Sequence, residues 1–473
     1  MSTDRDLDVA VVGAGVAGLT AAHELRRAGL QVRVFEAQDH VGGRMSSFRH
    51  GGFTVDRGAE QLPEQGYRAT WQLLDRLGVT PEEVPRIGKA LAVWRDGRAH
   101  PGLAGRFAPL TGPGLSPRAL PSMARMTAWT AWHRRSFDGD HPERTAAKAA
   151  TVRDFARRYH PDLHDYLLQP VAGSFFGWDT ARSTVAPLLS LLLSVGPVSG
   201  WRTYHDGMDL LARRLAAGVD VDLCSEVREV VADSGGGVRV RLAGREVTAR
   251  SAVLCAPAPV AARLHPGAPA DESPFLSACT FTPVLKVSCL LDRPLAPPSA
   301  KPLYVLLTPR TEDDTLSAII VDHAKHPGRA PVGKGLLTLV ASPERIGAFL
   351  QAPDGEVRDR LVAAASRYVP GLRQACTAAF VHSFTHGLPE ATPQALLHRR
   401  QFMDRPLRPV EYAGDWLTLR PASEAAVRAG ALAASRVLAR LRPRPLPRAP
   451  LSGRGAPARQ DMATTPHRAV EAR

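Results

Sequence analysis

The sequence predicts an α/β protein whose N-terminal part is a parallel, nucleotide-binding unit. The apolar run DVAVVG is followed by the glycine pattern G-x-G-x-x-G and then by AGLTAAHELRRAG, which has helical periodicity and stops at Gly29. The next apolar run, QVRVFE, ends in Glu36. Strand, glycine turn, helix and strand therefore follow one another as in a βαβ unit. A chain of 473 residues is long enough for two or three domains.

The glycine turn carries the nucleotide prediction because each of its residues has a physical task. Gly13 allows a tight turn, Gly15 lets a pyrophosphate approach the backbone, and Gly18 lets the helix pack closely on the strand. The phosphates would lie at the helix N-terminus, where free N–H groups and the helix dipole favour anions. Glu36, which closes the second strand, can accept hydrogen bonds from a ribose.

Composition limits the other classes of function. The net charge of +14 would suit nucleic-acid binding, but residues 441–473 alone hold seven Arg and two acidic residues. This segment is predicted to be a disordered tail, and the other basic residues form no stripe with aromatic residues, so we expect no nucleic-acid partner. Five scattered cysteines without a C-x-x-C pair argue against disulfides and against a metal site. We expect a cytoplasmic protein, with peripheral membrane contact through the apolar run at 185–201 as an alternative.

Two elements after the second strand indicate which nucleotide is bound. They are EAQDHVGGRMSSF at 36–48 and GGFTVDRGAEQL at 51–62. In this order they resemble the flavin-containing amine oxidase superfamily, which includes monoamine oxidases, L-amino acid oxidases, protoporphyrinogen oxidases and phytoene desaturase-like enzymes. In that family the Gly-Gly-Arg element lies along the FAD diphosphate and flavin, and the second element approaches the flavin ring.

Later segments extend the resemblance over about residues 7–440. Residues 220–260 resemble the segment that returns to the FAD domain, and residues 410–441 resemble the closing flavin signature, in which a helix N-terminus faces the flavin. The resemblance implies non-covalent FAD, since no cysteine follows Cys376 at the usual late position. The implied cofactor-binding residues are Gly13, Gly15, Ala17, Gly18, Glu36, Ala37, Gly43, Arg44, Gly58, Ala59, Val227, Ala256, Gly414, Asp415, Ala422 and Ser423.

The resemblance also implies how the domains are arranged. A Rossmann-type FAD-binding domain (GR2-like) is interleaved with a substrate domain made of a mixed sheet plus helices. The FAD-binding domain is expected to comprise residues 1–75, 201–270 and 396–440. The substrate domain is expected to comprise residues 76–200 and 271–395.

Lys286 is the main catalytic candidate. It lies in the strand-like run TFTPVLKVSCLLDRP at 280–294, where alternation separates a mixed face from an apolar face. The mixed face holds Val284, Lys286, Ser288 and Leu290; the apolar face holds Leu285, Val287, Cys289 and Leu291. The run resembles the strand that carries, in monoamine oxidases, a lysine bound through water to flavin N5. On pattern alone, the alternative is a solvated lysine on a half-buried strand.

Two further catalytic candidates are Glu60, expected beside the flavin, and His386 in THGLPE. Glu60 has a structural alternative, in which it accepts backbone hydrogen bonds. His205 and Asp206 are interpreted as a turn with capping rather than as an acid–base pair. In the segment 126–137, core packing is expected for the aromatic rings.

The resemblance leads to a function with alternatives. The body of the chain is similar to protoporphyrinogen oxidase-like members, and Ala422 stands where monoamine oxidases place one ring of their aromatic cage. We therefore expect an FAD-dependent oxidase or dehydrogenase that removes a hydride from a hydrophobic or aromatic small molecule, at C–C or C–N, with O2 or another electron acceptor. The alternatives are an amine or L-amino acid oxidase and a non-catalytic flavin-binding protein. The sequence carries no signal for an oligomeric state.

Overall fold

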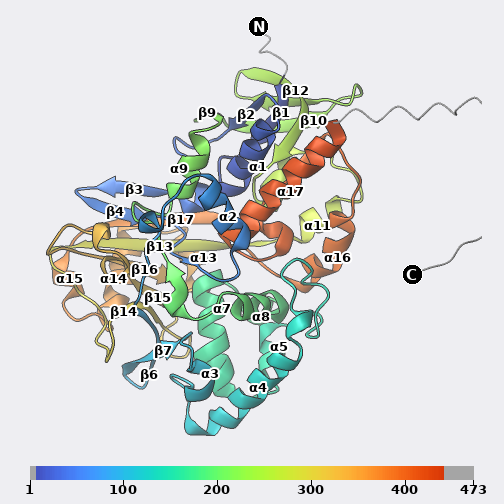
Figure 1. Ribbon diagram of the computed structural model, residues 1–473. Helices are drawn as coiled ribbons and strands as arrows, with labels where there is room; N and C mark the ends of the chain where they lie inside the picture. The colour runs from blue at the N-terminus through green and yellow to red at the C-terminus, as the bar shows by residue number, and fades with distance from the viewer. Residues whose placement is uncertain (1–6, 442–473) are drawn as a thin grey trace, which may run out of the picture.

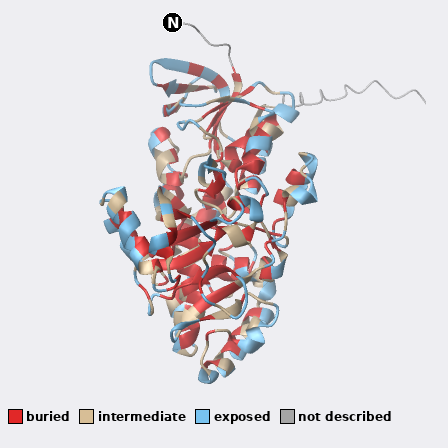
Figure 2. Ribbon diagram, turned by 90° about the vertical axis from the view of Figure 1, so that its left-hand side faces the viewer, coloured by how far each residue is buried: buried red, intermediate tan, exposed pale blue. Residues whose placement is uncertain are grey.

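The computed structural model describes residues 7–441, so the predicted tail at 441–473 lies outside the described residues except for Leu441. Two seven-stranded sheets dominate the architecture, one in the upper part of the molecule and one across its middle (Figure 1). Buried residues are concentrated in the interior strands of the sheets and on one side of the helices around them (Figure 2). The α/β class that the sequence predicts is confirmed.

The first sheet contains the nucleotide turn. Its strand order is β10 (Val227–Ala232), β11 (Val238–Leu242), β12 (Arg245–Leu254), β1 (Leu7–Val12), β2 (Val32–Phe35), β9 (Asp220–Asp222), with β18 (Val410–Tyr412) beside β12. β1 runs parallel to both β2 and β12. The glycine turn therefore opens at the carboxyl ends of parallel strands, where α/β sheets bind ligands.

Helices α1 (Val16–Arg27) and α17 (Ser423–Leu441) pack against one another on this sheet, side by side in Figure 1. The end of α1 and the start of α17 lie where the sequence predicts: Gly29, with φ +87°, follows α1, and α17 starts at Ser423. Gly430 makes the close packing possible, because a Cβ there would lie 2.3 Å from the carbonyl oxygen of Ala17. Other helices near this sheet are α2 (Arg68–Arg76), α9 (Leu210–Ala216), α10 (Ala258–Leu264), α11 (Ser273–Ala278) and α16 (Pro393–Met403).

The second sheet is mixed. Its order is β17 (Cys376–Pro389), β13 (Phe281–Leu291), β16 (Gly335–Ala341), β15 (Leu316–Val321), β14 (Leu303–Leu307), β6 (Ala90–Arg95), β7 (Arg98–Leu103). The apolar face predicted for β13 lies in a core cluster with α13 (Pro343–Phe349) and α14 (Asp354–Ala365). Between the sheets and beside them lie α12 (Asp322–Lys325), α15 (Leu372–Ala375) and the two-stranded pairs β3 (Ser47–His50) with β4 (Phe53–Asp56) and β5 (Leu62–Pro63) with β8 (Trp201–Arg202).

A helical layer forms the lower part of the molecule in Figure 1. It consists of α3 (Ala108–Thr111), α4 (Leu120–Trp132), α5 (Val152–Ala156), α6 (Pro161–Leu163), α7 (Gln169–Phe176) and α8 (Val185–Ser194). The core packing expected for the rings of α4 is wrong for Trp132, whose surface is 86% exposed at the helix end, whereas Trp129 packs on Phe155. Among residues 7–441, no helix is both long and apolar enough to cross a membrane.

Two helices cross the boundaries of the expected domain ranges: α2 extends past residue 75, and α16 begins before residue 396. The hairpin β6–β7, at 90–103, belongs to the second sheet rather than to the helical layer that follows it. This placement follows from parallel pairing of β6 with β14. The domain boundaries themselves stay a prediction.

Candidate active site

A single cavity of about 1740 Å³ joins the glycine turn to the second sheet and the helical layer. Ligand pockets usually have volumes of about 300–1,000 Å³. The space is therefore large enough for a dinucleotide together with a second molecule. All the predicted cofactor-binding residues border this cavity except Gly18.

The nucleotide end of the cavity is shaped by glycines. Gly13 has φ +103°, a conformation that L side chains rarely adopt, and a Cβ at Gly18 would lie 2.0 Å from the carbonyl oxygen of Gly13. At Gly15 an added Cβ would meet nothing within 4 Å, so this residue faces open space. No side chain caps the N-terminus of α1, and its first turn holds no acidic residue. Its N–H groups are left for an anion, as the sequence predicts.

Glu36 is fixed at the end of β2 by its own hydrogen bonds. Its carboxylate accepts the backbone N–H of Ala14 at 2.6 Å and that of Gln38 at 3.0 Å. Ser225 donates its N–H to the carbonyl oxygen of Glu36 at 2.7 Å, which brings the segment before Val227 to the same end of the cavity. The predicted adenosine end is therefore assembled from two distant segments.

Arg44 joins three segments around the middle of the cavity. Its guanidinium donates two hydrogen bonds of 2.8 Å to Asp415 and one of 2.9 Å to the carbonyl oxygen of Gly387. Such paired, charge-assisted bonds hold a guanidinium in one orientation. Gly58 packs directly against this element, because a Cβ there would lie 2.1 Å from the carbonyl oxygen of Arg44.

The start of α17 closes this side of the cavity. Ala422 and Ser423 border the cavity, while Glu424 turns away and accepts hydrogen bonds from the N–H groups of Ala69 and Thr70, at 3.0 and 2.9 Å. Glu424 thereby binds the N-terminal turn of α2 and leaves the N-terminus of α17 facing the cavity.

Three residues that border the cavity each have a buried side-chain polar atom that lacks a hydrogen-bond partner among residues 7–441. The atoms are Oγ of Ser46, Nε of Arg57 and Nε1 of Trp201; Ser46 and Arg57 lie next to each other, since Arg57 donates its N–H to the carbonyl oxygen of Ser46 at 3.0 Å. Buried polar atoms are rarely left without a hydrogen bond. These atoms therefore fit the polar groups of a bound cofactor. The sequence analysis did not single out these residues, although Ser46 and Arg57 lie within the two elements at 36–48 and 51–62.

Lys286 points from β13 into the cavity and is 4% exposed. Its Nζ donates a hydrogen bond of 2.5 Å to the carbonyl oxygen of Gly58 and forms an ion pair with Oε1 of Glu60. The interpretation as a solvated surface lysine is therefore wrong. Lys286 instead ties the second sheet to the loop between β4 and β5.

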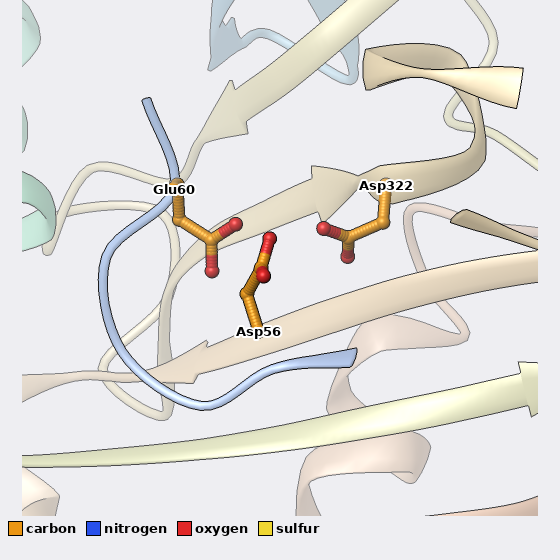
Figure 3. A group of neighbouring side chains, drawn as sticks. All are labelled: Asp56, Glu60 and Asp322. Carbon is orange, nitrogen blue, oxygen red and sulfur yellow. The ribbon is translucent and has the colours of Figure 1, made fainter. Parts of the chain in front are cut away.

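Behind Glu60 lies a buried cluster of charges that the sequence analysis did not anticipate. The carboxylates of Asp56, Glu60 and Asp322 point toward one another (Figure 3). The Nζ of Lys325 lies 2.8 Å from Asp56, 2.6 Å from Glu60 and 2.9 Å from Asp322. Because this ammonium already contacts every carboxylate, the group is an ion-pair cluster. Arg329 completes the cluster with a 2.9 Å contact to Asp56.

Burial and neighbouring charges act against each other in this cluster. Burial opposes the charged form of Lys325, but the three carboxylates outweigh it and raise the pKa of Lys325 well above its usual value. Burial also works against ionised Asp56, yet Arg329 and Lys325 hold the pKa of Asp56 well below its usual range. For Glu60 burial prevails over the two lysines and raises the pKa of its carboxyl. Glu60 therefore protonates more readily than Asp56.

His382 lies opposite Lys286 on β17 and borders the same cavity. Its Nε2 is 3.2 Å from Oγ of Ser288, which is 3.2 Å from Oγ1 of Thr338, and Thr338 donates to Asp322 at 2.7 Å. Burial, with smaller contributions from Lys286 and Arg57, lowers the pKa of His382 to about 4. A neutral imidazole therefore stands beside Lys286 at neutral pH.

His386 borders the cavity but does not join Lys286. It lies four residues farther along β17 than His382, which corresponds to about 13 Å of extended strand. Its ring contacts Phe281, and burial, aided by Arg263, lowers its pKa. His205 and Asp206 hydrogen-bond to each other in an exposed turn that does not border the cavity.

Comparison with known proteins identifies the family of this chain. The family profile described as "Flavin containing amine oxidoreductase" matches residues 16–438. The chain belongs to this family. The predicted oxidoreductase class and a flavin as the cofactor are thereby confirmed. Cys255, the cysteine that borders the cavity among the described residues, has its thiol pKa raised by burial, consistent with non-covalent FAD.

Individual relatives share shorter segments. The chain is 43% identical over 90 residues to a putative flavin-containing monoamine oxidase of Mycobacterium tuberculosis, which is 19% of each chain. It is 46% identical over 79 residues to protoporphyrinogen oxidase 2 of Arabidopsis thaliana, 16% of this chain and 15% of that one. The chain thus aligns with less than a fifth of these relatives. The structure of cyclohexylamine oxidase from Brevibacterium oxydans shares the fold, with a TM-score of 0.73 at 17% identity over 92% of this chain and 99% of that chain.

Proposed function

We propose that this protein is an FAD-dependent oxidase or dehydrogenase that removes a hydride from an uncharged, hydrophobic small molecule. The observation that carries the proposal is the lining of the cavity beyond the cofactor end. It is formed by apolar side chains of α4, α7, α8 and the second sheet, among them Met123, Met126, Leu168, Val171, Leu189 and Ile320. A lining of this kind selects for apolar area rather than for charge.

The carboxylates that border the cavity support an uncharged substrate. Glu36 and Glu226 lie at the nucleotide end, Asp415 is paired with Arg44, and Glu60 is paired with two lysines. Within residues 7–441, no free carboxylate of the cavity faces the apolar part, where a substrate ammonium would need one. Ala422 also supplies no ring on which a cation could stack.

The proposed roles follow from the positions of the side chains. The glycine turn, Glu36, the Arg44–Asp415 pair and the start of α17 would hold FAD, which supplies the hydride acceptor when bound. Ser46 and Arg57 would donate to its polar groups. Lys286 would hold a proton at Nζ inside the closed cavity, and Glu60 would fix its position.

A second candidate, an amine or amino-acid oxidase, is favoured by Lys286 itself. The strand that carries this lysine resembles the one that the monoamine oxidases use, and the lysine is buried and directed into the cavity. Lys286 is paired with Glu60 and adds no charge partner for a substrate in the apolar part of the cavity. The position of Lys286 therefore does not decide between the two candidates.

Anaerobic bleaching of the flavin absorbance separates the two candidates. The purified holoprotein is mixed under nitrogen with polyenes, porphyrinogens, aromatic amines, aliphatic amines and amino acids, with free FAD as the control. We expect bleaching by one of the hydrophobic classes that carry no ammonium group, the polyenes or the porphyrinogens. Bleaching by simple amines or amino acids alone would reject the proposal in favour of the second candidate.

A further inference from the structure

Lys325 holds a special position in the charge cluster. Its side chain is completely buried, its Nζ contacts three carboxylates at 2.6–2.9 Å, and it does not border the cavity. It cannot touch a substrate or a cofactor in that cavity. Its contact with the cavity runs through Glu60, which accepts from Lys325 with Oε2 and from Lys286 with Oε1.

We propose that Lys325 is a positioning residue that acts on Lys286 through Glu60. It keeps Glu60 ionised and oriented, and ionised Glu60 keeps Lys286 protonated and directed into the cavity. This inference deepens the proposed function and rests on it. It assigns a role to a lysine in the short segment DHAK, which no motif marks.

The charge balance of the cluster supports this assignment. Asp56, Glu60 and Asp322 face the three cations Lys286, Lys325 and Arg329, so the buried cluster is neutral when all are ionised. Without Lys325, three carboxylates would face two cations, and burial would favour proton uptake by one of them. Asp56 keeps its contact with Arg329 and Asp322 its bond from Thr338, so Glu60 is the carboxylate that takes up the proton.

The geometry of Glu60 shows how the effect reaches Lys286. The two oxygens of one carboxylate are divided between the two lysines. A lysine bound on one side fixes the rotation of the group and so directs the other oxygen at its partner. Once Glu60 is protonated, Lys286 loses its counter-charge and keeps the carbonyl oxygen of Gly58 as an acceptor. Its charged form is then less favoured in a closed cavity.

The other groups that face Lys286 do not replace Glu60. His382 on β17 is neutral above about pH 5, since its pKa is lowered to about 4. Tyr304 on β14, which donates to Gln61 at 2.6 Å, has its pKa raised well above its usual value by burial and is neutral as well. The guanidinium of Arg57 remains charged at every pH used. Among residues 7–441, Glu60 is thus the carboxylate that pairs with Lys286.

Reoxidation of photoreduced flavin by O2 tests the inference without a substrate. The rate is measured from about pH 6 to about pH 10 in the wild type, Lys286→Met, Glu60→Gln, Lys325→Met, Lys325→Arg and the double variant Glu60→Gln/Lys325→Met. We expect Lys286→Met to change the pH profile of the wild type. In Lys325→Met the profile should be displaced from that of the wild type by about one unit or more, whereas the profile of Lys325→Arg should stay close to it.

The double variant distinguishes action through Glu60 from a general loss of structure. If Lys325 acts through Glu60, its removal adds no further displacement in the Glu60→Gln background. A full additive displacement, or a wild-type profile in folded Lys325→Met, would overturn the inference. If Lys325→Met does not fold, a wild-type profile in Glu60→Gln alone overturns it. Failure to find a substrate would affect the proposed function but not this measurement, because light supplies the reduced flavin.

Discussion

Lys325 lies 2.6 Å from the Glu60 carboxylate that also binds Lys286, although it is separated from Glu60 by 265 positions in the chain. The contact joins the end of the second sheet to the loop between β4 and β5. Two elements that the sequence places in different domains are therefore held together by a buried ion pair next to the cavity. The same charged residues therefore contribute to the stability of the fold and to the chemistry of the site.

Removing Lys325 should destabilise the protein strongly. Lys325→Met leaves three buried carboxylates with two cations, and breaking a buried ion pair on one side costs about 3–5 kcal/mol. Urea unfolding of apoprotein measures this cost. Lys334→Met is the matched control because Lys334 is exposed, and its effect should stay within about 0.5 kcal/mol. Equal effects of the two substitutions would show that the cluster contributes nothing.

Lys286→Met should separate catalysis from cofactor binding. Methionine fills the buried position without a charge, and Glu60 keeps its contact with Lys325, so FAD binding should be retained. Turnover or flavin reoxidation should fall by about tenfold or more, since proton-transferring groups commonly contribute about 10²–10⁴-fold. Stopped-flow measurements of both half-reactions provide the readout, with Lys334→Met as the control. If Lys286→Met shows wild-type rates in both half-reactions, Lys286 has a structural role and no catalytic one.

The sequence predicts the faces of β13 because alternation depends only on neighbouring residues. Leu285, Val287 and Cys289 lie in the core, as predicted, and Lys286 lies on the other face. The sequence could not predict how deeply Lys286 is buried, because its partner Glu60 comes from a loop 226 positions away. Pattern alone favours a solvated lysine, and the tertiary contact overrides that pattern.

The shape of the glycine turn was predictable for a different reason. Each glycine of the turn meets a local steric demand that the chain itself imposes, as the 2.0 Å approach at Gly18 shows. Ser46 and Arg57 escaped prediction because an unpaired buried atom is visible only once its surroundings are assembled. Asp322 and Lys325 escaped for the same reason, since the segment DHAK is equally compatible with an exposed turn.

The Arg44–Asp415 pair should contribute to FAD affinity. Asp415→Asn keeps the shape of the side chain but removes the charge that receives two guanidinium hydrogen bonds. Hydrogen bonds to charged groups are worth about 1.5–3 kcal/mol, so we expect the FAD dissociation constant to rise roughly 10- to 100-fold. Titration of apoprotein with FAD, followed by flavin fluorescence, measures it. Asp404→Asn is the control, since Asp404 pairs with Arg400 on the exposed face of α16. An unchanged constant in Asp415→Asn would contradict the assigned role.

Close packing of α1 on α17 should depend on Gly430. Gly430→Ala places a Cβ 2.3 Å from the carbonyl oxygen of Ala17, so the helices must move apart, which typically costs about 1–3 kcal/mol. Gly347→Ala in α13 is the matched control, because its Cβ would meet nothing within 4 Å. This control should be neutral or stabilising by up to about 1 kcal/mol. Thermal unfolding with and without FAD compares the two. Equal melting temperatures would show that the helices can move apart freely.

His382 should make the stability of the protein depend on pH between about 4 and about 6.5. The pKa is 6.5 for an ordinary histidine and about 4 for His382 in the folded state. In this window the unfolded chain binds more protons than the folded chain, so stability falls as the pH falls. The contribution is complete above about pH 6.5 and is lost as the pH approaches about 4.

Between pH 7 and pH 5 this single group should account for about 2 kcal/mol of lost unfolding free energy. His382→Gln keeps a polar group that can reach Ser288 but cannot titrate, so it should remove that part of the pH dependence. Urea unfolding at the two pH values measures the difference in both proteins. His40→Gln is the control, because His40 is a partly exposed histidine with its own partner in Asp39. If His382→Gln and the wild type lose the same free energy between the two pH values, His382 is not buried in its neutral form, and the neutral imidazole beside Lys286 must be abandoned.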